Sequence, residues 1–164
     1  FSGPGASGKV TGLRQGQIDT LLTMPVYINV HSTQQPAGIV RSALDKTVDF
    51  AMDIPLSGNN EVGPVTTTAT GLAILRIAGD SLISKVTVTG VEANDTLTVS
   101  HIHRGAIGVN GPVRVFLASS LADFGITKIT FLPDSMDTMV KTEACYVNVH
   151  SRRNPPGKIR GPIR

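Results

Sequence analysis

The sequence has few cysteines and aromatic residues and no long apolar run. Among its 164 residues there is one cysteine, no tryptophan, and aromatic residues make up 4%. A single cysteine excludes an internal disulfide bond, and Cys145 is expected to be a buried free thiol in an apolar strand. No run of 18 apolar residues occurs, so we expect no membrane-spanning helix. The net charge of +3 is small and lacks aromatic stacking partners, which argues against a nucleic-acid-binding protein.

The residues that are abundant point to β-structure. The apolar residues are mainly Val, Ile and Leu, Thr is frequent, and there are 17 Gly and 10 Pro. This composition favours short strands separated by turns. Leu82–Thr89 alternates cleanly between apolar and polar residues, as in a strand with one buried face. Further strands are expected at 47–54, 65–78, 97–103 and 113–117. The sequence therefore predicts an all-β protein, an antiparallel β-sandwich or barrel.

One segment occurs twice without a gap. Tyr27–Ser32 recurs as Tyr146–Ser151, and Arg41 recurs as Arg160 (146 − 27 and 160 − 41 both give 119). Each copy is expected to contain a short strand, a short helix and a β-hairpin. The expected strands start the copies at Lys9–Leu13 and 128–130, and the helices follow at 17–23 and 134–141. We therefore predict a partial repeat over 1–42 and a complete domain over 43–164.

The histidines form the main candidate site. His101 and His103 are two residues apart, so they share one face of their strand, and His150 shares a face with Tyr146 and Asn148. If the two strands are neighbours, three imidazoles can bind Zn or Cu and leave a fourth position open. His31 is the repeat equivalent of His150.

The histidines could have a structural role, and a catalytic role would need a further group. The histidines could instead donate hydrogen bonds to backbone carbonyls and brace the glycine-rich segment 105–112. Catalysis would also need a general base, and no motif places Glu61, Asp95 or Glu143 beside the histidines. The sequence therefore leaves enzyme activity undecided and gives no catalytic residue.

Several segments together resemble one known family. Leu56–Val62, His101–Ala106, Gly108–Val113 and Tyr146–His150, in this order, are similar to the CHRD domain found in chordin. The resemblance spans about 50–164, and its closing portion is also similar to 9–41. It implies a secreted or cell-surface β-sandwich that often occurs in tandem copies. The His-x-His strand before a glycine loop is also similar to Cu/Zn superoxide dismutase, which implies a Greek-key sandwich of that kind.

The extra hairpin raises the question of what covers its apolar face. A lone hairpin is marginally stable in water, so we expect it to pack on something. It could complete the sandwich of its own chain in place of 128–164, and the C-terminal tail would then reach into the next subunit and build a head-to-tail homopolymer. It could also pack as an annex on its own complete domain, or the chain could be one window of a longer tandem array. The residues expected to mediate assembly are Tyr27, Asn29 and His31 and their equivalents Tyr146, Asn148 and His150.

The leading hypothesis is thus a secreted filament or scaffold subunit that exchanges a C-terminal-type hairpin. The alternatives are a Cu- or Zn-binding extracellular protein, which could be redox-active, and a module that binds a glycan or a protein. Asn94 begins an N-x-Thr sequon in an expected loop, which predicts a glycosylation site. A basic cluster near the C-terminus is expected to be a solvated hairpin tip and tail, or a site for an anionic glycan. Its members are Arg152, Arg153, Lys158, Arg160 and Arg164.

Overall fold

The computed structural model describes residues 10–44 and 47–164. The chain divides into two units, residues 1–47 and 48–164, which we describe separately. The sheets of both units are antiparallel, and the larger unit consists mainly of strands, so the predicted all-β class is confirmed. Within the described residues, no helix is long and apolar enough to span a membrane.

The larger unit is built on one eight-stranded sheet with the strand order β7-β6-β9-β10-β3-β4-β5-β8. Every neighbouring pair in this sheet is antiparallel. Its elements are β3 (Phe50–Ser57), η1 (Gly58–Asn60), β4 (Thr70–Ala78), β5 (Ser81–Thr89), β6 (Leu97–Arg104), β7 (Val113–Ala118), η2 (Leu121–Asp123), β8 (Lys128–Phe131), α2 (Asp134–Thr142), β9 (Cys145–Ser151) and β10 (Ile159–Pro162).

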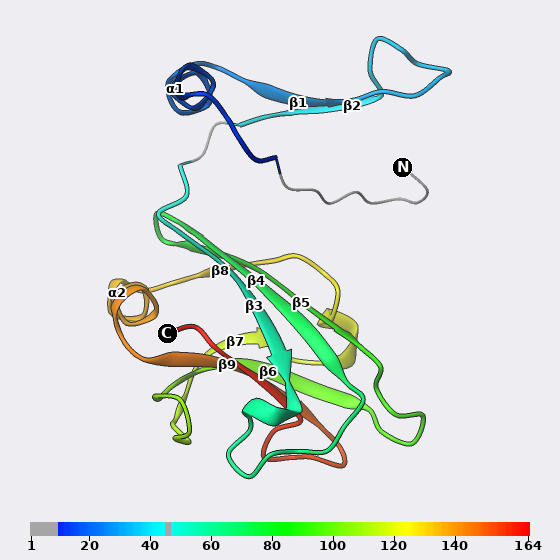
Figure 1. Cartoon of the computed structure of the whole chain (residues 1–164), viewed down its shortest axis with the longest axis vertical. Helices are drawn as coiled ribbons and strands as arrows, with labels where there is room; N and C mark the ends of the chain where they lie inside the picture. Colours follow the sequence, from blue (N-terminus) through cyan, green and yellow to red (C-terminus); the bar gives the residue numbers. More distant parts are fainter. Residues whose placement is uncertain (1–9, 45–46) are drawn as a thin grey trace. The chain divides into compact units, whose positions relative to one another are not determined.

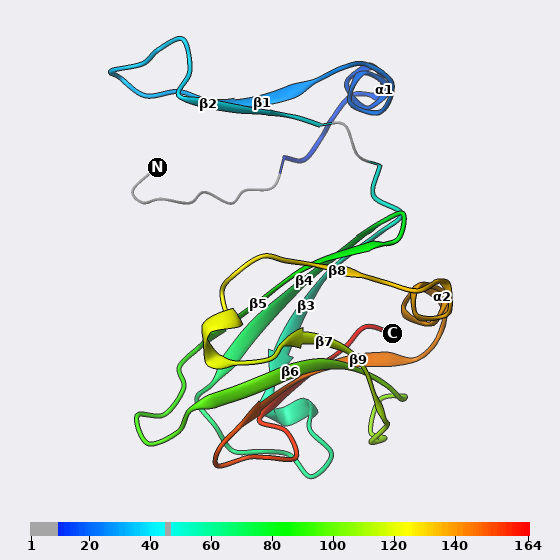
Figure 2. The same cartoon turned by 180° about the vertical axis from the view of Figure 1, so that it is seen from behind.

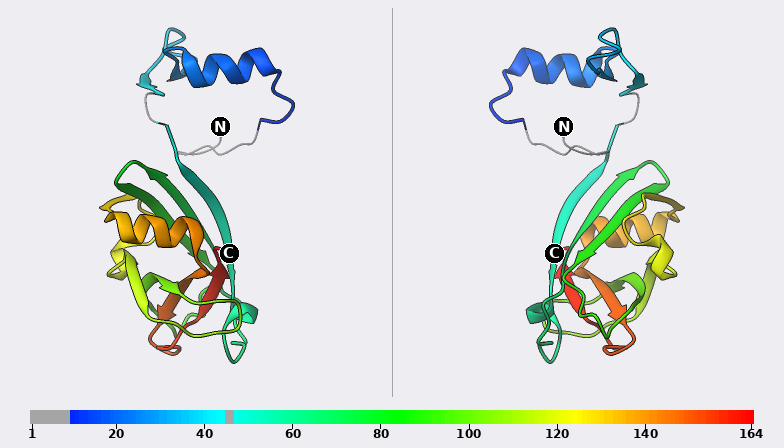
Figure 3. Two further views of the ribbon diagram at one scale, coloured as in Figure 1. Left: turned by 90° about the vertical axis from the view of Figure 1, so that its left-hand side faces the viewer. Right: turned by 90° about the vertical axis from the view of Figure 1, so that its right-hand side faces the viewer.

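The sheet bends into two facing layers. Strands β3, β4, β5 and β8 form one layer, and β6, β7 and β9 form the other (Figures 1 and 2). The views at right angles show the strong twist of β3 and β4 and the helix α2 at the side of the sheet (Figure 3). Apolar side chains from both layers fill the space between them, as in a sandwich. The fully buried ones include Ile54, Leu75, Ile77, Leu82, Ile102 and Val147.

The hairpin β9–β10 joins the two layers. On one side β9 pairs with β6, where His101 is opposite Asn148 and Ile102 is opposite Val147. On the other side β10 meets β3, where Arg160 is opposite Ser57. We call residues 145–162 the closing hairpin, because it pairs with β6 of one layer and with β3 of the other and so connects the two layers.

The smaller unit repeats the closing hairpin and the helix before it. It contains α1 (Gln15–Thr23), β1 (Tyr27–Val30) and β2 (Val40–Ala43). Helix α1 corresponds residue for residue to α2 at the offset of the sequence repeat. We call residues 26–43 the N-terminal hairpin. The two predicted helices and both predicted hairpins are therefore present.

The same side-chain contacts recur in both hairpins. The ring nitrogen Nδ1 of His31 lies 2.8 Å from the carbonyl oxygen of Pro36, and His150 Nδ1 lies 2.8 Å from that of Pro155. In both hairpins an asparagine amide bonds the next carbonyl of the turn, and an arginine lies over the tyrosine ring. Local sequence therefore sets the hairpin conformation in both places.

The predicted strand at Lys9–Leu13 is not found. Residues 10–13 are irregular, and Lys9 lies outside the described residues. Its equivalent, β8, is a strand because it pairs with β5. The described part of the smaller unit holds only β1 and β2, so it offers no such partner. A strand at a sheet edge needs its ladder hydrogen bonds more than a matching sequence.

The two hairpins differ in how much of their side chains is buried. In the closing hairpin Tyr146 is 2% exposed and Ile159 is fully buried, whereas their equivalents Tyr27 and Val40 are 59% and 62% exposed. None of the described residues 10–44 is buried. The N-terminal hairpin therefore carries an apolar face that its own unit does not cover.

A matched pair of substitutions tests this difference. We expect Ile159→Ala to lower the free energy of unfolding of the larger unit by about 3 kcal/mol, because it leaves a cavity in the core. The equivalent Val40→Ala is expected to change it by less than about 0.5 kcal/mol. Urea unfolding followed by circular dichroism measures both, and equal effects would contradict the structure.

Candidate metal centre

Three histidines converge on the outer face of strands β6 and β9. The pairing of His101 with Asn148 and of His103 with Tyr146 puts His150 next to them on the same face. One ring nitrogen of each of the three lies within 4.8 Å of the others. His101 and His103 are each 7% exposed, and His150 is half-buried. The register that the sequence could not give therefore brings the predicted ligands together.

Backbone hydrogen bonds fix the tautomer of two of these rings. His103 Nδ1 lies 2.9 Å from the carbonyl oxygen of Gly111, and His150 Nδ1 lies 2.8 Å from that of Pro155. A carbonyl can only accept, so Nδ1 carries the proton in both rings and each Nε2 has a lone pair that can accept a hydrogen bond or bind a metal ion. This is the outer-shell arrangement that orients metal-binding histidines. His103 Nε2 is buried and has no hydrogen-bond partner.

The third ring lies within ligand distance of the second. His101 Nδ1 is 3.3 Å from His150 Nε2. Two nitrogens bound to one tetrahedral ion at about 2.05 Å are separated by about 3.3 Å, so the pair already has the spacing of two ligands. Without an ion, His101 Nδ1 donates to His150 Nε2. To bind an ion through Nδ1, the neutral His101 ring would carry its proton on Nε2 instead.

The electrostatics of the site lower the pKa values of His101 and His103. Burial, together with the neighbouring His150 and His103, lowers the pKa of His101 to about 4. Burial likewise lowers the pKa of His103, against the hydrogen bond to Gly111 that raises it. Neutral imidazole is the form that binds metal, so neither of these two rings has to lose a proton to bind an ion near neutral pH.

An aromatic and cationic layer supports His103. Its ring stacks on Tyr146 with centroids 4.9 Å apart, and the Arg160 guanidinium lies 3.2 Å from the centre of the Tyr146 ring. Arg160 donates to the carbonyl oxygens of Ala106 and Val109 in the glycine-rich loop. Arg160 therefore links the glycine-rich loop to Tyr146, and Tyr146 supports the ring of His103. His103 also bonds the loop through Nδ1, as the bracing alternative predicted, while its Nε2 stays without a partner.

Glu61 is a buried carboxyl beside the closing hairpin. It is 8% exposed, and its Oε1 has no hydrogen-bond partner. Burial raises its pKa to about 7, although Arg160 and Asn148 act in the opposite direction. A Cβ atom on Gly157 would lie 2.7 Å from both carboxylate oxygens, so only glycine fits there.

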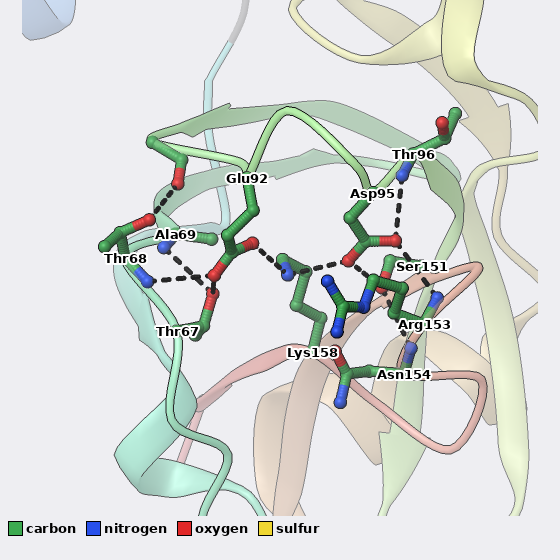
Figure 4. Close-up of polar contacts among 11 residues, drawn as sticks. Thr67, Thr68, Ala69, Glu92, Asp95, Thr96, Ser151, Arg153, Asn154 and Lys158 are labelled. Atoms are coloured by element: carbon green, nitrogen blue, oxygen red, sulfur yellow. Dashed lines mark hydrogen bonds and ion pairs between the residues drawn. The ribbon is translucent and has the colours of Figure 1, made fainter.

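Lys158 is the centre of a second polar cluster, which we call the lysine cluster. Its Nζ lies 2.6 Å from Glu92 Oε2 and 2.8 Å from Asp95 Oδ2, between the two carboxylates (Figure 4). Asp95 also accepts from the Ser151 hydroxyl and the Arg153 backbone N–H. Burial raises the pKa of Asp95, but these hydrogen bonds outweigh it and hold the pKa below its usual range.

These contacts correct the expectation that the basic cluster is a solvated hairpin tip and tail. Lys158 and Arg160 are each 2% exposed, so they are not part of a solvated tip. Each finds internal partners, because a buried cation is tolerated only when it is paired or hydrogen-bonded. Arg152 and Arg153 are exposed, which leaves a smaller positive surface for an anionic glycan than the sequence suggested.

The structure also gives the surroundings of the remaining predicted residues. His31 belongs to the N-terminal hairpin, where it repeats the backbone contact of His150. Asp95 pairs with Lys158, and Glu143 pairs with Arg104. Asn94 lies exposed in a turn, and its glycosylation stays a prediction. The free thiol of Cys145 is buried, as predicted.

Sequence reasoning missed three members of the site's surroundings. Phe116 packs edge-on against His101 with ring centroids 4.4 Å apart, and Arg160 and Glu61 complete the polar side. A signal existed for Arg160, because Arg41 repeats it at the same offset from the tyrosine. Glu61 was a candidate carboxyl in the sequence, but no motif gave its position, since the fold alone brings it beside the hairpin.

The fold and site thus define an antiparallel β-sandwich closed by a C-terminal hairpin, with a histidine cluster on its outer face. The CHRD domain family matches residues 52–163, and the chain belongs to this family. No curated protein and no solved structure matches the chain.

Glu61 generates a pH-dependent prediction. Its pKa is raised in the folded state, so its contribution to stability is full below about pH 4.5 and is lost as the pH rises through 7. We expect Glu61→Gln to remove this dependence and to gain up to about 3 kcal/mol relative to wild type between pH 4.5 and 8. Urea unfolding at several pH values measures it.

Glu143→Gln is the control, because this carboxyl pairs with Arg104 at the surface. It is expected to change stability by less than about 1 kcal/mol at any of these pH values. Parallel pH profiles for wild type and Glu61→Gln would rule out a raised pKa at Glu61.

Proposed function

We propose that this protein is an extracellular CHRD module that binds one Zn or Cu ion through His101, His103 and His150. The observation that carries the proposal is the buried, unpaired Nε2 of His103, in a ring whose centroid lies 5.6 Å from that of His101 and 5.9 Å from that of His150. A buried nitrogen without a partner costs about 1–3 kcal/mol, and a metal ion would remove this cost.

The donor set fits these metals. Three neutral imidazoles suit Zn and Cu, whereas Mg and Ca prefer oxygen ligands. Three protein ligands leave a further coordination position for water or another small molecule. His150 is the least buried of the three, so the open position is reached from its side.

Metal content tests the proposal directly. Wild-type protein is loaded with Zn²⁺ or Cu²⁺ and then desalted. Inductively coupled plasma mass spectrometry is expected to find one ion per chain. His103→Ala is expected to weaken binding by more than about 100-fold, because it removes a ligand rather than an outer-shell partner. Binding is measured by titration calorimetry.

His31→Ala is the matched control, since it removes the equivalent histidine of the N-terminal hairpin. It should leave the one-ion stoichiometry and the affinity unchanged. Equal binding by wild type and His103→Ala, or loss of the ion in His31→Ala alone, would contradict the proposed site.

A second function is favoured by the duplicated hairpin. We infer that the protein is also a structural scaffold subunit, in which the N-terminal hairpin closes a CHRD-type sheet outside residues 48–164. The support is that this hairpin repeats the closing hairpin in its turn, its His and Asn contacts and its helix, while its apolar face is exposed. An exposed apolar face of this kind marks an interaction site.

A graft tests whether the N-terminal hairpin can close such a sheet. In the full chain, residues 145–162 are replaced by the sequence of 26–43, with Lys158 and Gly161 retained. We expect the larger unit to unfold cooperatively in urea and to bind one metal ion, because the tyrosine, asparagine, histidine and arginine are the same. A graft that does not fold would show that the N-terminal hairpin is no closing hairpin.

A further inference from the structure

The N-terminal hairpin differs from the closing hairpin at two positions where the latter contacts the rest of its unit most tightly. Ile39 is the equivalent of Lys158, and Ser42 is the equivalent of Gly161. Both differences bear on which sheet the N-terminal hairpin can close, a question that rests on the scaffold function proposed above.

The first difference is electrostatic. The Asp95 side chain is fully buried, and the Lys158 side chain is 2% exposed. Together with Glu92 they place one cation between two carboxylates (Figure 4). An isoleucine in place of the lysine would bury Asp95 without its cation and would remove the ion pair of Glu92. Breaking a buried pair by removing one partner is strongly destabilising, because it leaves an uncompensated charge.

The second difference is steric. A Cβ atom on Gly161 would lie 2.6 Å from Ile54 Cγ2 and 2.7 Å from Leu56 Cδ2, and it would overlap the Pro55 carbonyl oxygen. All three belong to β3, the strand that β10 meets. A backbone oxygen cannot move aside as a flexible side chain can. A serine at this position would therefore push β10 away from β3.

Several contacts within the hairpin itself are common to both copies. Gly38 and Gly157 both have positive φ angles, of 121° and 156°, in the turn. Arg41 lies over Tyr27 as Arg160 lies over Tyr146. The N-terminal hairpin therefore has the general features of a closing hairpin but lacks the two that match residues 48–144.

We propose that the N-terminal hairpin closes a CHRD-type sheet different from that of residues 48–164. This partner has uncharged residues in place of Glu92 and Asp95, and it has room beside its β3 strand for a serine side chain. The lysine cluster and Gly161 make the sheet selective: the closing hairpin can pair with it, and the N-terminal hairpin cannot. Copies of this chain therefore do not exchange hairpins with one another.

Point substitutions in the full chain test the selection. Lys158→Ile and Gly161→Ser each introduce the residue of the N-terminal hairpin. We expect each to lower the folded-to-unfolded equilibrium constant of the larger unit about 100-fold or more, measured by urea unfolding. Val147→Ile and Ile159→Val also introduce residues of the N-terminal hairpin and are the controls, with a change below about 10-fold.

A compensating background separates charge from packing. In the Glu92→Gln, Asp95→Asn background, Lys158→Ile should cost at least about 10-fold less than in wild type, because no uncompensated carboxylate is left. A graft of 26–43 that carries both differences should lose its cooperative transition, while the graft that retains Lys158 and Gly161 keeps it.

The outcomes distinguish the two proposals. If Lys158→Ile and Gly161→Ser are as mild as the controls, or if the graft with both differences is as stable as the graft without them, the selection is overturned and the closing-hairpin function stands. If the graft that retains Lys158 and Gly161 does not fold, the closing-hairpin function itself is overturned, and the selection with it.

Discussion

The pairing of β9 with β6 is the contact on which the rest of the larger unit depends. The two strands come from distant parts of the chain, and their register puts Val147 beside Ile102 in the core. The same register puts His150 beside His101 and His103 on the outer face. Because side chains alternate along a strand, one pairing fixes the core and the candidate metal centre together. A shift by one residue would lose both.

Polar groups at the edges of the closing hairpin contribute specificity more than stability. Lys158 and Arg160 are both buried and fully engaged, one by two carboxylates and the other by a tyrosine ring and loop carbonyls. Such clusters gain little net free energy compared with apolar packing, but a mismatched partner pays the full cost of an unpaired charge. The hairpin is therefore matched to its own sheet by chemistry as well as by shape.

The two hairpins show one local structure in two environments. Turn, helix and side-chain contacts recur in both, yet Tyr146 is buried and Tyr27 is exposed. The lowered pKa of His103 and its unpaired Nε2 likewise result from burial in the assembled sheet. Hairpin conformation is thus encoded locally, whereas the histidine cluster and the lysine cluster exist only in the assembled sheet.

The sequence by itself determined the features that depend on neighbours along the chain. Alternation predicted the strands, the constant offset predicted the second hairpin, and the spacing of His101 and His103 put them on one face. The expected strand at Lys9–Leu13 was wrong over 10–13, because a strand needs a partner that sequence similarity does not supply. Only the tertiary structure decided that β6 and β9 are neighbours, that Lys158 and Arg160 are internal, and that Glu61 lies by the hairpin. Those features depend on contacts between residues far apart in the chain, and no local pattern records such contacts.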